Sequence, residues 1–165
     1  SKLSLHRALL NGSAELLVVY DEESSLEVAY ALVLTKNLYG YVLLKYMAVL
    51  PWYRGKGVGI AAMRLINKRY ADRQGIIAEL TSFEDEDGSM IKGLRKFFAR
   101  FGYVVVDSDY RIGGAPVELM VKPIKGTFEI EPVEHRIIRD FYTRILNPFA
   151  MDKMIDIRPV RKPEE

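Results

Sequence analysis

Residues 47–63 read M-A-V-L-P-W-Y-R-G-K-G-V-G-I-A-A-M and join a strand-like run to a helix through a basic, glycine-rich loop. The loop glycines are spaced by two: Gly55, Gly57 and Gly59. Because glycine has no Cβ, such a loop lets backbone N–H groups turn toward one point and lets a bulky anion approach closely. The positive end of the helix dipole lies at the same point, and Arg54 and Lys56 add two cationic side chains. The stretch predicts a phosphate or pyrophosphate site, although the glycines alone suit an ordinary strand-to-helix turn equally well.

The composition limits the classes of protein to which the chain can belong. Its 165 residues, 49% of them hydrophobic and 28% charged, suit one globular domain. A net charge of +2 without a basic stripe gives no indication of nucleic-acid binding. There is no cysteine, and His6 and His135 lack metal-ligand spacing, so no metal site is expected. No apolar run approaches the roughly 18 residues that span a bilayer, and no signal peptide is visible, so we expect a cytoplasmic protein without membrane contact.

The periodicity of apolar residues predicts an alternation of strands and helices. The expected helices are Leu3–Leu10, Val58–Arg73 and Met90–Phe101. The expected strands are Glu15–Asp21, Leu26–Thr35, Tyr41–Leu50, Ile76–Ser82, Tyr103–Tyr110 and Val117–Lys122. The first three strands follow one another as an antiparallel meander. A strand, a crossover helix and another strand then imply a parallel pair at the centre of the sheet, where neighbouring strands can splay.

The loop, in this order of elements, resembles the acetyl-CoA signature of the GNAT family of N-acetyltransferases. That signature is Arg or Gln, two residues, Gly, one residue, and Gly or Ala; Arg54, Gly57 and Gly59 match it. Met47–Pro51 resembles the strand ending of the family, and Phe97–Tyr103 resembles its helix ending in Gly-Phe or Gly-Tyr. The resemblance extends from about Glu15 to Ile124. It implies an α/β (mixed α+β) fold: a mostly antiparallel sheet with a central, splayed parallel pair, flanked by helices.

The resemblance also implies acetyl-CoA as cosubstrate. Backbone N–H groups of the loop would hold the pyrophosphate: Arg54, Gly55, Lys56, Gly57, Val58, Gly59 and Ile60. Backbone groups at the strand end would pair with the pantetheine arm, and one N–H would polarise the thioester carbonyl: Met47, Ala48 and Val49. A Walker-type nucleotide loop is excluded, because it needs Ser or Thr after its Gly-Lys pair, whereas Lys56 is followed by Gly and Val.

The catalytic residues are less clear from the sequence. Many family members use as general acid a tyrosine four residues before the helix-ending glycine, but this chain has Phe98 there. Tyr103 is a substitute, as in principle are Tyr110 and Tyr46. The expected strand before the loop carries no acid, so the candidate bases are two acids from the next strand and its exit: Glu79 and Glu84. A strand glutamate that faces solvent or pairs with a lysine is the alternative for Glu79.

An acidic run, Glu84–Asp87, follows the strand that contains Glu79. At the mouth of the substrate side it would concentrate cationic amines. The alternative is a solvated loop whose acids favour the N-terminus of the next helix.

The C-terminal part departs from the family pattern. Relatives open with a strand and one or two helices, whereas here only about 14 residues precede the meander. We expect an acetyltransferase core at 1–125, without a normal first unit, and an extension at 126–165 that contains an amphipathic helix, Val133–Leu146. Met154–Val160 resembles the opening strand of relatives and is expected to fill the sheet edge beside Glu15–Tyr20. It would do so within one chain or by exchange in a homodimer; a disordered tail is the alternative.

Two functions follow from these observations. The first is transfer of acetyl from acetyl-CoA to the primary amine of a small molecule or peptide, by direct attack in a ternary complex. Without cysteine, an acetyl-cysteine intermediate is impossible. The second is a non-catalytic acyl-CoA-binding sensor or interaction module, which Phe98 and the missing acid before the loop leave open.

Overall fold

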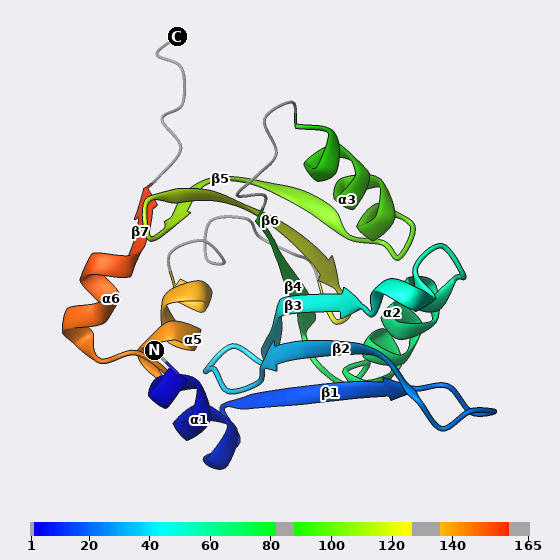
Figure 1. The fold of residues 1–165 in the computed structure, drawn as a ribbon. Helices are drawn as coiled ribbons and strands as arrows, with labels where there is room; N and C mark the ends of the chain where they lie inside the picture. Colours follow the sequence, from blue (N-terminus) through cyan, green and yellow to red (C-terminus); the bar gives the residue numbers. More distant parts are fainter. Residues whose placement is uncertain (1, 82–87, 127–135, 159–165) are drawn as a thin grey trace, which may run out of the picture.

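The computed structural model describes residues 2–81, 88–126 and 136–158. The helices are α1 (Lys2–Leu10), α2 (Val58–Arg69), α3 (Ser89–Ala99), α5 (Ile138–Thr143) and α6 (Pro148–Met154). The strands are β1 (Ala14–Tyr20), β2 (Glu27–Leu34), β3 (Tyr41–Val49), β4 (Gly75–Leu80), β5 (Val104–Ile112), β6 (Ala115–Pro123) and β7 (Ile155–Arg158). Within the described ranges, these strands form one sheet in the order β1-β2-β3-β4-β6-β5-β7 (Figure 1).

The sheet is antiparallel except for its central pair, β3 and β4. Their parallel pairing runs from Tyr41 opposite Gly75 to Leu44 opposite Ala78 and ends there. All six residues of β4 are buried, as expected for a strand with apolar layers on both faces. The predicted mixed sheet with a central parallel pair is therefore confirmed.

Two apolar layers sandwich the sheet. On one face α2 and α3 contribute residues such as Met63 and Phe98 to a cluster with the inner strands. On the other face α1, α5 and α6 pack against a second cluster that includes Leu43 and Ile77. Ile138 of α5, which is 0% exposed, shows how completely this layer is closed. Figure 1 shows the two groups of helices on opposite sides of the strands.

The prediction that the late strand lies beside Glu15–Tyr20 is wrong. β7 instead pairs antiparallel with β5, from Asp109 opposite Arg158 to Ile112 opposite Ile155, at the opposite end of the sheet from β1. The reason is the packing of α6, which anchors Met151 in the same apolar cluster as Ile155 and delivers the chain to β5. Exchange of this segment between two chains stays a prediction.

Candidate active site

The glycine loop lies between β3 and the start of α2. Gly55 and Gly57 have φ angles of +74° and +81°, a region that residues with a Cβ enter only with strain. Gly57 is the N-cap of α2, and no side chain caps the helix. The first N–H groups of a helix have no acceptor within the helix, and the first turn of α2 contains no acidic residue. These groups are therefore available to an anion, at the positive end of the helix dipole.

Two exposed cations flank the loop. The Nε of Arg54 donates to the carbonyl oxygen of Val49 at 3.1 Å, which ties the loop to the end of β3. The Nζ of Lys56 lies 5.8 Å from the centroid of the Tyr53 ring. Two exposed positive charges thus lie in the loop that precedes α2, and they favour an anionic ligand there.

A cleft opens where β3 and β4 separate. In β3 a bulge interrupts the pairing with β2: Leu32 faces Tyr46 and Val33 faces Leu44, so Lys45 has no opposite residue. The bulge coincides with the last β3–β4 pair. The resulting cleft has a volume of about 150 Å³ and is lined by residues of β3, β4 and α3: Leu44, Lys45, Tyr46, Met47, Glu79, Leu80, Thr81, Leu94, Phe97 and Phe98.

Main-chain groups at the end of β3 face this gap. Leu50 donates its N–H to the carbonyl of Val28, next to β2, at 2.9 Å. Main-chain groups alternate between the two edges of a strand. The N–H groups of Met47 and Val49 therefore turn toward the gap, whereas those of Ala48, opposite Tyr30, turn toward β2.

Glu79 lies at the splay with its side chain fully enclosed. Its Oε2 accepts from the Nζ of Lys45 and, at 3.0 Å, from the hydroxyl of Tyr142. Its Oε1 accepts from the hydroxyls of Tyr110 and Tyr142, at 2.9 and 2.8 Å. The carboxylate thus accepts from three donor groups on three other elements, β3, β5 and α5, and the Tyr142 hydroxyl contacts both of its oxygens. The Lys45 side chain reaches solvent, with 26% of its surface exposed, whereas that of Glu79 does not.

The two tyrosines remain donors because of their surroundings. Burial, together with the negative charge of Glu79, raises the pKa of Tyr110 and of Tyr142 well above the ordinary value. Both phenols therefore keep their protons at neutral pH and hold the carboxylate in place.

The other predicted catalytic residues lie elsewhere. Tyr103 is buried beside the ring of Phe98, and its hydroxyl donates to Asn67 of α2 at 3.1 Å. Burial also raises its pKa. Tyr46 lines the cleft and packs at a tilt against Tyr30. Glu84 and the acidic run lie outside the described residues.

Two of the residues that donate to Glu79, Lys45 and Tyr142, were not predicted as site residues from the sequence. Lys45 is a single charge inside an apolar strand, and that isolation was the available signal. Tyr142 belongs to the apolar stripe of its helix, so its hydroxyl gave no separate signal. Neither residue's proximity to Glu79 is visible without the fold.

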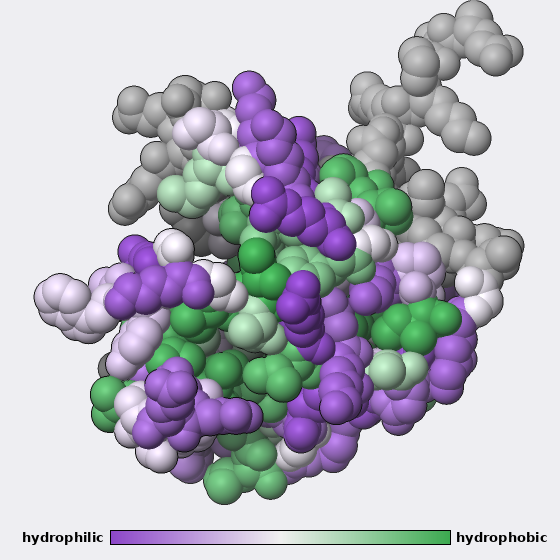
Figure 2. Space-filling model, turned by 90° about the vertical axis from the view of Figure 1, so that its right-hand side faces the viewer, coloured by the Kyte–Doolittle hydropathy of each residue, from purple (hydrophilic) through white to green (hydrophobic). Residues whose placement is uncertain are grey.

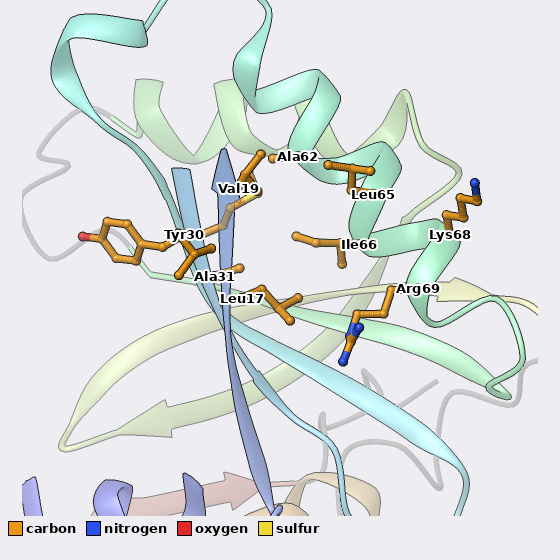
Figure 3. A pocket seen from close by; sticks show the side chains of 11 residues that line it. Leu17, Val19, Tyr30, Ala31, Ala62, Leu65, Ile66, Lys68 and Arg69 are labelled. Carbon is orange, nitrogen blue, oxygen red and sulfur yellow. The ribbon is translucent and has the colours of Figure 1, made fainter. Parts of the chain in front are cut away.

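A larger cavity lies on the α2 side of the sheet. Its volume is about 530 Å³, and it is lined by Leu17, Val18, Val19, Tyr30, Ala31, Met47, Ala62, Leu65, Ile66, Lys68 and Arg69. Figure 3 shows apolar side chains of β1 and β2 facing those of α2. On the face that Figure 2 displays, hydrophobic residues are exposed between hydrophilic ones. Arg69 at its rim pairs with Glu15. The lining of this cavity includes neither the glycine loop nor Glu79, and it shares Met47 with the smaller cleft.

The described part of the chain contains no cluster of three or more His, Asp or Glu residues suited to a metal ion. None of the helices in the described ranges has the length and apolarity needed to cross a membrane.

Comparisons with known proteins agree with this geometry. The model of the acetyltransferase (GNAT) domain family matches residues 12–105. No curated protein sequence matches the chain. Among solved structures, a protein of Bacteroides thetaiotaomicron assigned to the GNAT family as an acetyltransferase superposes with a TM-score of 0.64 at 18% identity, covering 86% of this chain and 78% of its own.

Two further solved structures show the same fold. Nourseothricin acetyltransferase gives a TM-score of 0.55 at 17% identity, with 70% of this chain and 68% of that chain covered. Aminoglycoside 6′-N-acetyltransferase, solved with coenzyme A, gives a TM-score of 0.52 at 15% identity, with 74% of this chain and 79% of that chain covered. At such identities these likenesses concern the fold alone, whereas the family match spans more than half of the sequence. The chain therefore belongs to the GNAT family of acetyltransferases.

Proposed function

We propose that the chain transfers the acetyl group of acetyl-CoA to a primary amine of a small molecule or peptide, by direct attack in a ternary complex. The observation that carries the proposal is the cleft between β3 and β4, which begins at Lys45 and Glu79 and lies beside the strand that leads into the glycine loop. The cleft and the loop offer sites for the two ends of one extended, anionic cosubstrate.

The cofactor side of the site consists of main-chain groups. The N–H groups of residues 54–60 bind the pyrophosphate at the start of α2, where Gly55 and Gly57 leave open space around the backbone. Met47 and Val49 offer N–H groups toward the gap, and one of them polarises the thioester carbonyl as it becomes an oxyanion. Side-chain variation at these positions is compatible with both roles.

On the acceptor side, Glu79 is the base that receives the proton of the attacking amine. No cysteine is present, so the acetyl group passes directly to the amine. CoA leaves as a thiolate; its thiol pKa near 8.5 makes a dedicated acid dispensable, and Phe98 supplies none. Tyr103 donates to Asn67 and is not among the residues that line the cleft.

A second candidate function is a non-catalytic acyl-CoA-binding module. One observation favours it: the Glu79 side chain is fully enclosed, and its four hydrogen bonds come from the protein itself. An added amine would have to displace Lys45 to reach it.

The test combines acetyl-CoA binding by calorimetry with CoA release in the presence of a panel of amines. Because the chain contains no cysteine, a thiol reagent reports released CoA without background from the protein. We expect saturable binding and release that depends on one class of amine. Gly57→Ala, which forces a Cβ onto a φ of +81°, should weaken binding at least about tenfold; Gly93→Ala, in open space on α3, is the matched control. Binding without turnover on any amine would favour the module, and absence of binding would refute both functions.

A further inference from the structure

Lys45 is a primary amine that the protein itself holds inside the cleft. The bulge in β3 directs it there, and its side chain lines the cleft together with Met47 and Glu79. Its Nζ hydrogen-bonds to the Glu79 carboxylate and lies 5.3 Å from the centroid of the Tyr142 ring. With 26% of its surface exposed, the side chain reaches the space in which a bound thioester would lie.

The position of this amine is that of an acetyl acceptor. An acceptor amine must sit in the cleft, within hydrogen-bonding reach of a group that takes its proton. The Nζ of Lys45 meets both conditions without any added molecule. The hydroxyls of Tyr110 and Tyr142 both donate to Oε1 and hold the carboxylate in place, while Oε2 accepts from Lys45 as well as from Tyr142.

We propose that Lys45 is an acetylation site of the chain's own activity: the Nζ of Lys45 accepts the acetyl group of acetyl-CoA bound in the same molecule. This inference rests on the proposed function for the presence of the thioester in the cleft. In the step, the neutral Nζ forms a bond to the thioester carbonyl carbon, the carbon–sulfur bond breaks, and CoA leaves with the electron pair. Glu79 receives the proton that the ammonium loses before attack. The nitrogen of the tetrahedral intermediate then loses one of its two protons as the intermediate collapses, and this proton neutralises the CoA thiolate through solvent, so the product amide keeps one N–H. The products are Nε-acetyl-Lys45 and CoA.

Acetylation changes the site in a defined way. It removes the positive charge that pairs with Glu79 and leaves one N–H donor in place of three. The carboxylate then keeps its two tyrosine partners but loses its cation. A cleft of about 150 Å³ also loses room to the added acetyl group. The modified and unmodified chains should therefore differ in their activity toward added amines.

The experiment incubates the full chain with acetyl-CoA and no added amine and follows the mass of the intact protein, with peptide mapping. We expect one acetyl group per chain, located on Lys45, at a rate independent of chain concentration because the reaction is intramolecular. Lys45→Arg keeps the charge and should abolish the modification. Glu79→Gln should slow it at least tenfold, and its urea midpoint shows whether it is folded. Lys92→Arg, at an exposed lysine of α3, is the matched control and should change nothing.

Three outcomes would overturn the inference. Acetyl groups spread over exposed lysines, at equal rates in the native and the urea-denatured chain, would mean chemical acetylation. Saturated acetyl-CoA binding and turnover of an added amine, with Lys45 unmodified, would refute the inference and leave the proposed function intact. Absence of acetyl-CoA binding would refute both.

Discussion

Replacing Ile138 by alanine tests whether the C-terminal helix α5 is an integral part of the folded core. Ile138 is 0% exposed and belongs to the cluster that contains Leu43, Ile77 and Leu119 of the sheet. The substitution removes three carbons, which at about 0.8 kcal/mol each is about 2.4 kcal/mol of lost burial. The unfilled cavity raises the expected loss in free energy of unfolding to about 3–4 kcal/mol.

Urea unfolding, followed by circular dichroism, measures the change. The single tryptophan, Trp52, is 84% exposed and would be a poor probe. Leu38→Ala is the matched control, because Leu38 is 79% exposed and its backbone hydrogen bond to Asp140 survives the change; it should lose under about 0.5 kcal/mol. We expect one cooperative transition for both variants. A loss below about 1 kcal/mol for Ile138→Ala, or a separate early transition, would show that α5 does not share the core.

Three further predictions concern the tyrosines and the glycines. Burial raises the pKa of Tyr110 and Tyr142, so the folded chain holds these two protons more tightly than the unfolded chain. The stability that the two phenols contribute is therefore complete below about pH 10, and above it the free energy of unfolding falls by about 1.4 kcal/mol per pH unit for each tyrosine. Urea midpoints that stay constant between about pH 9 and 11 would contradict this. Tyr142→Phe leaves the Glu79 carboxylate with one donor fewer and should lower the free energy of unfolding by about 1–3 kcal/mol, whereas an unchanged urea midpoint would mean that the hydroxyl does not bond there. Gly75→Ala would place a Cβ 2.6 Å from a Tyr41 ring carbon and 2.8 Å from a backbone oxygen, and it should lower the free energy of unfolding by about 1–3 kcal/mol. Gly93→Ala, in open space within α3, should raise it by about 0.5–1 kcal/mol. Equal melting temperatures for the two variants would contradict the packing described.

Most of the fold could be predicted because its signals are local. The three strands of the meander, seven to nine residues long, have either alternating apolar and polar residues or continuous apolar runs, and turns separate them. The crossover through α2 indicated that β4 is a parallel neighbour of β3, because parallel strands are joined by a crossover connection that is usually a helix. Pattern and connectivity together sufficed for these elements.

The position of β7 could not be predicted in the same way. Its sequence marks it as a strand, but a strand of four residues has no signal for its neighbour. Two edges were open to it, and the choice depends on how α6 packs, through Met151, against residues from distant parts of the chain. Resemblance to an opening strand pointed to the wrong edge because it carries no information about the connection.

The two sides of the candidate site differ for the same reason. The proposed cofactor side is a continuous stretch of backbone, so its glycines and its place between β3 and α2 could be predicted from the sequence. The acceptor side draws Lys45, Glu79, Tyr110 and Tyr142 from β3, β4, β5 and α5. Lys45 and Glu79 stand out as the single charges of their strands, but the two tyrosines do not stand out in their elements, and only the fold brings the amine, the carboxylate and the phenols together. In the proposed function, an added amine competes with Lys45 for the Glu79 carboxylate, because the Nζ of Lys45 already hydrogen-bonds to it.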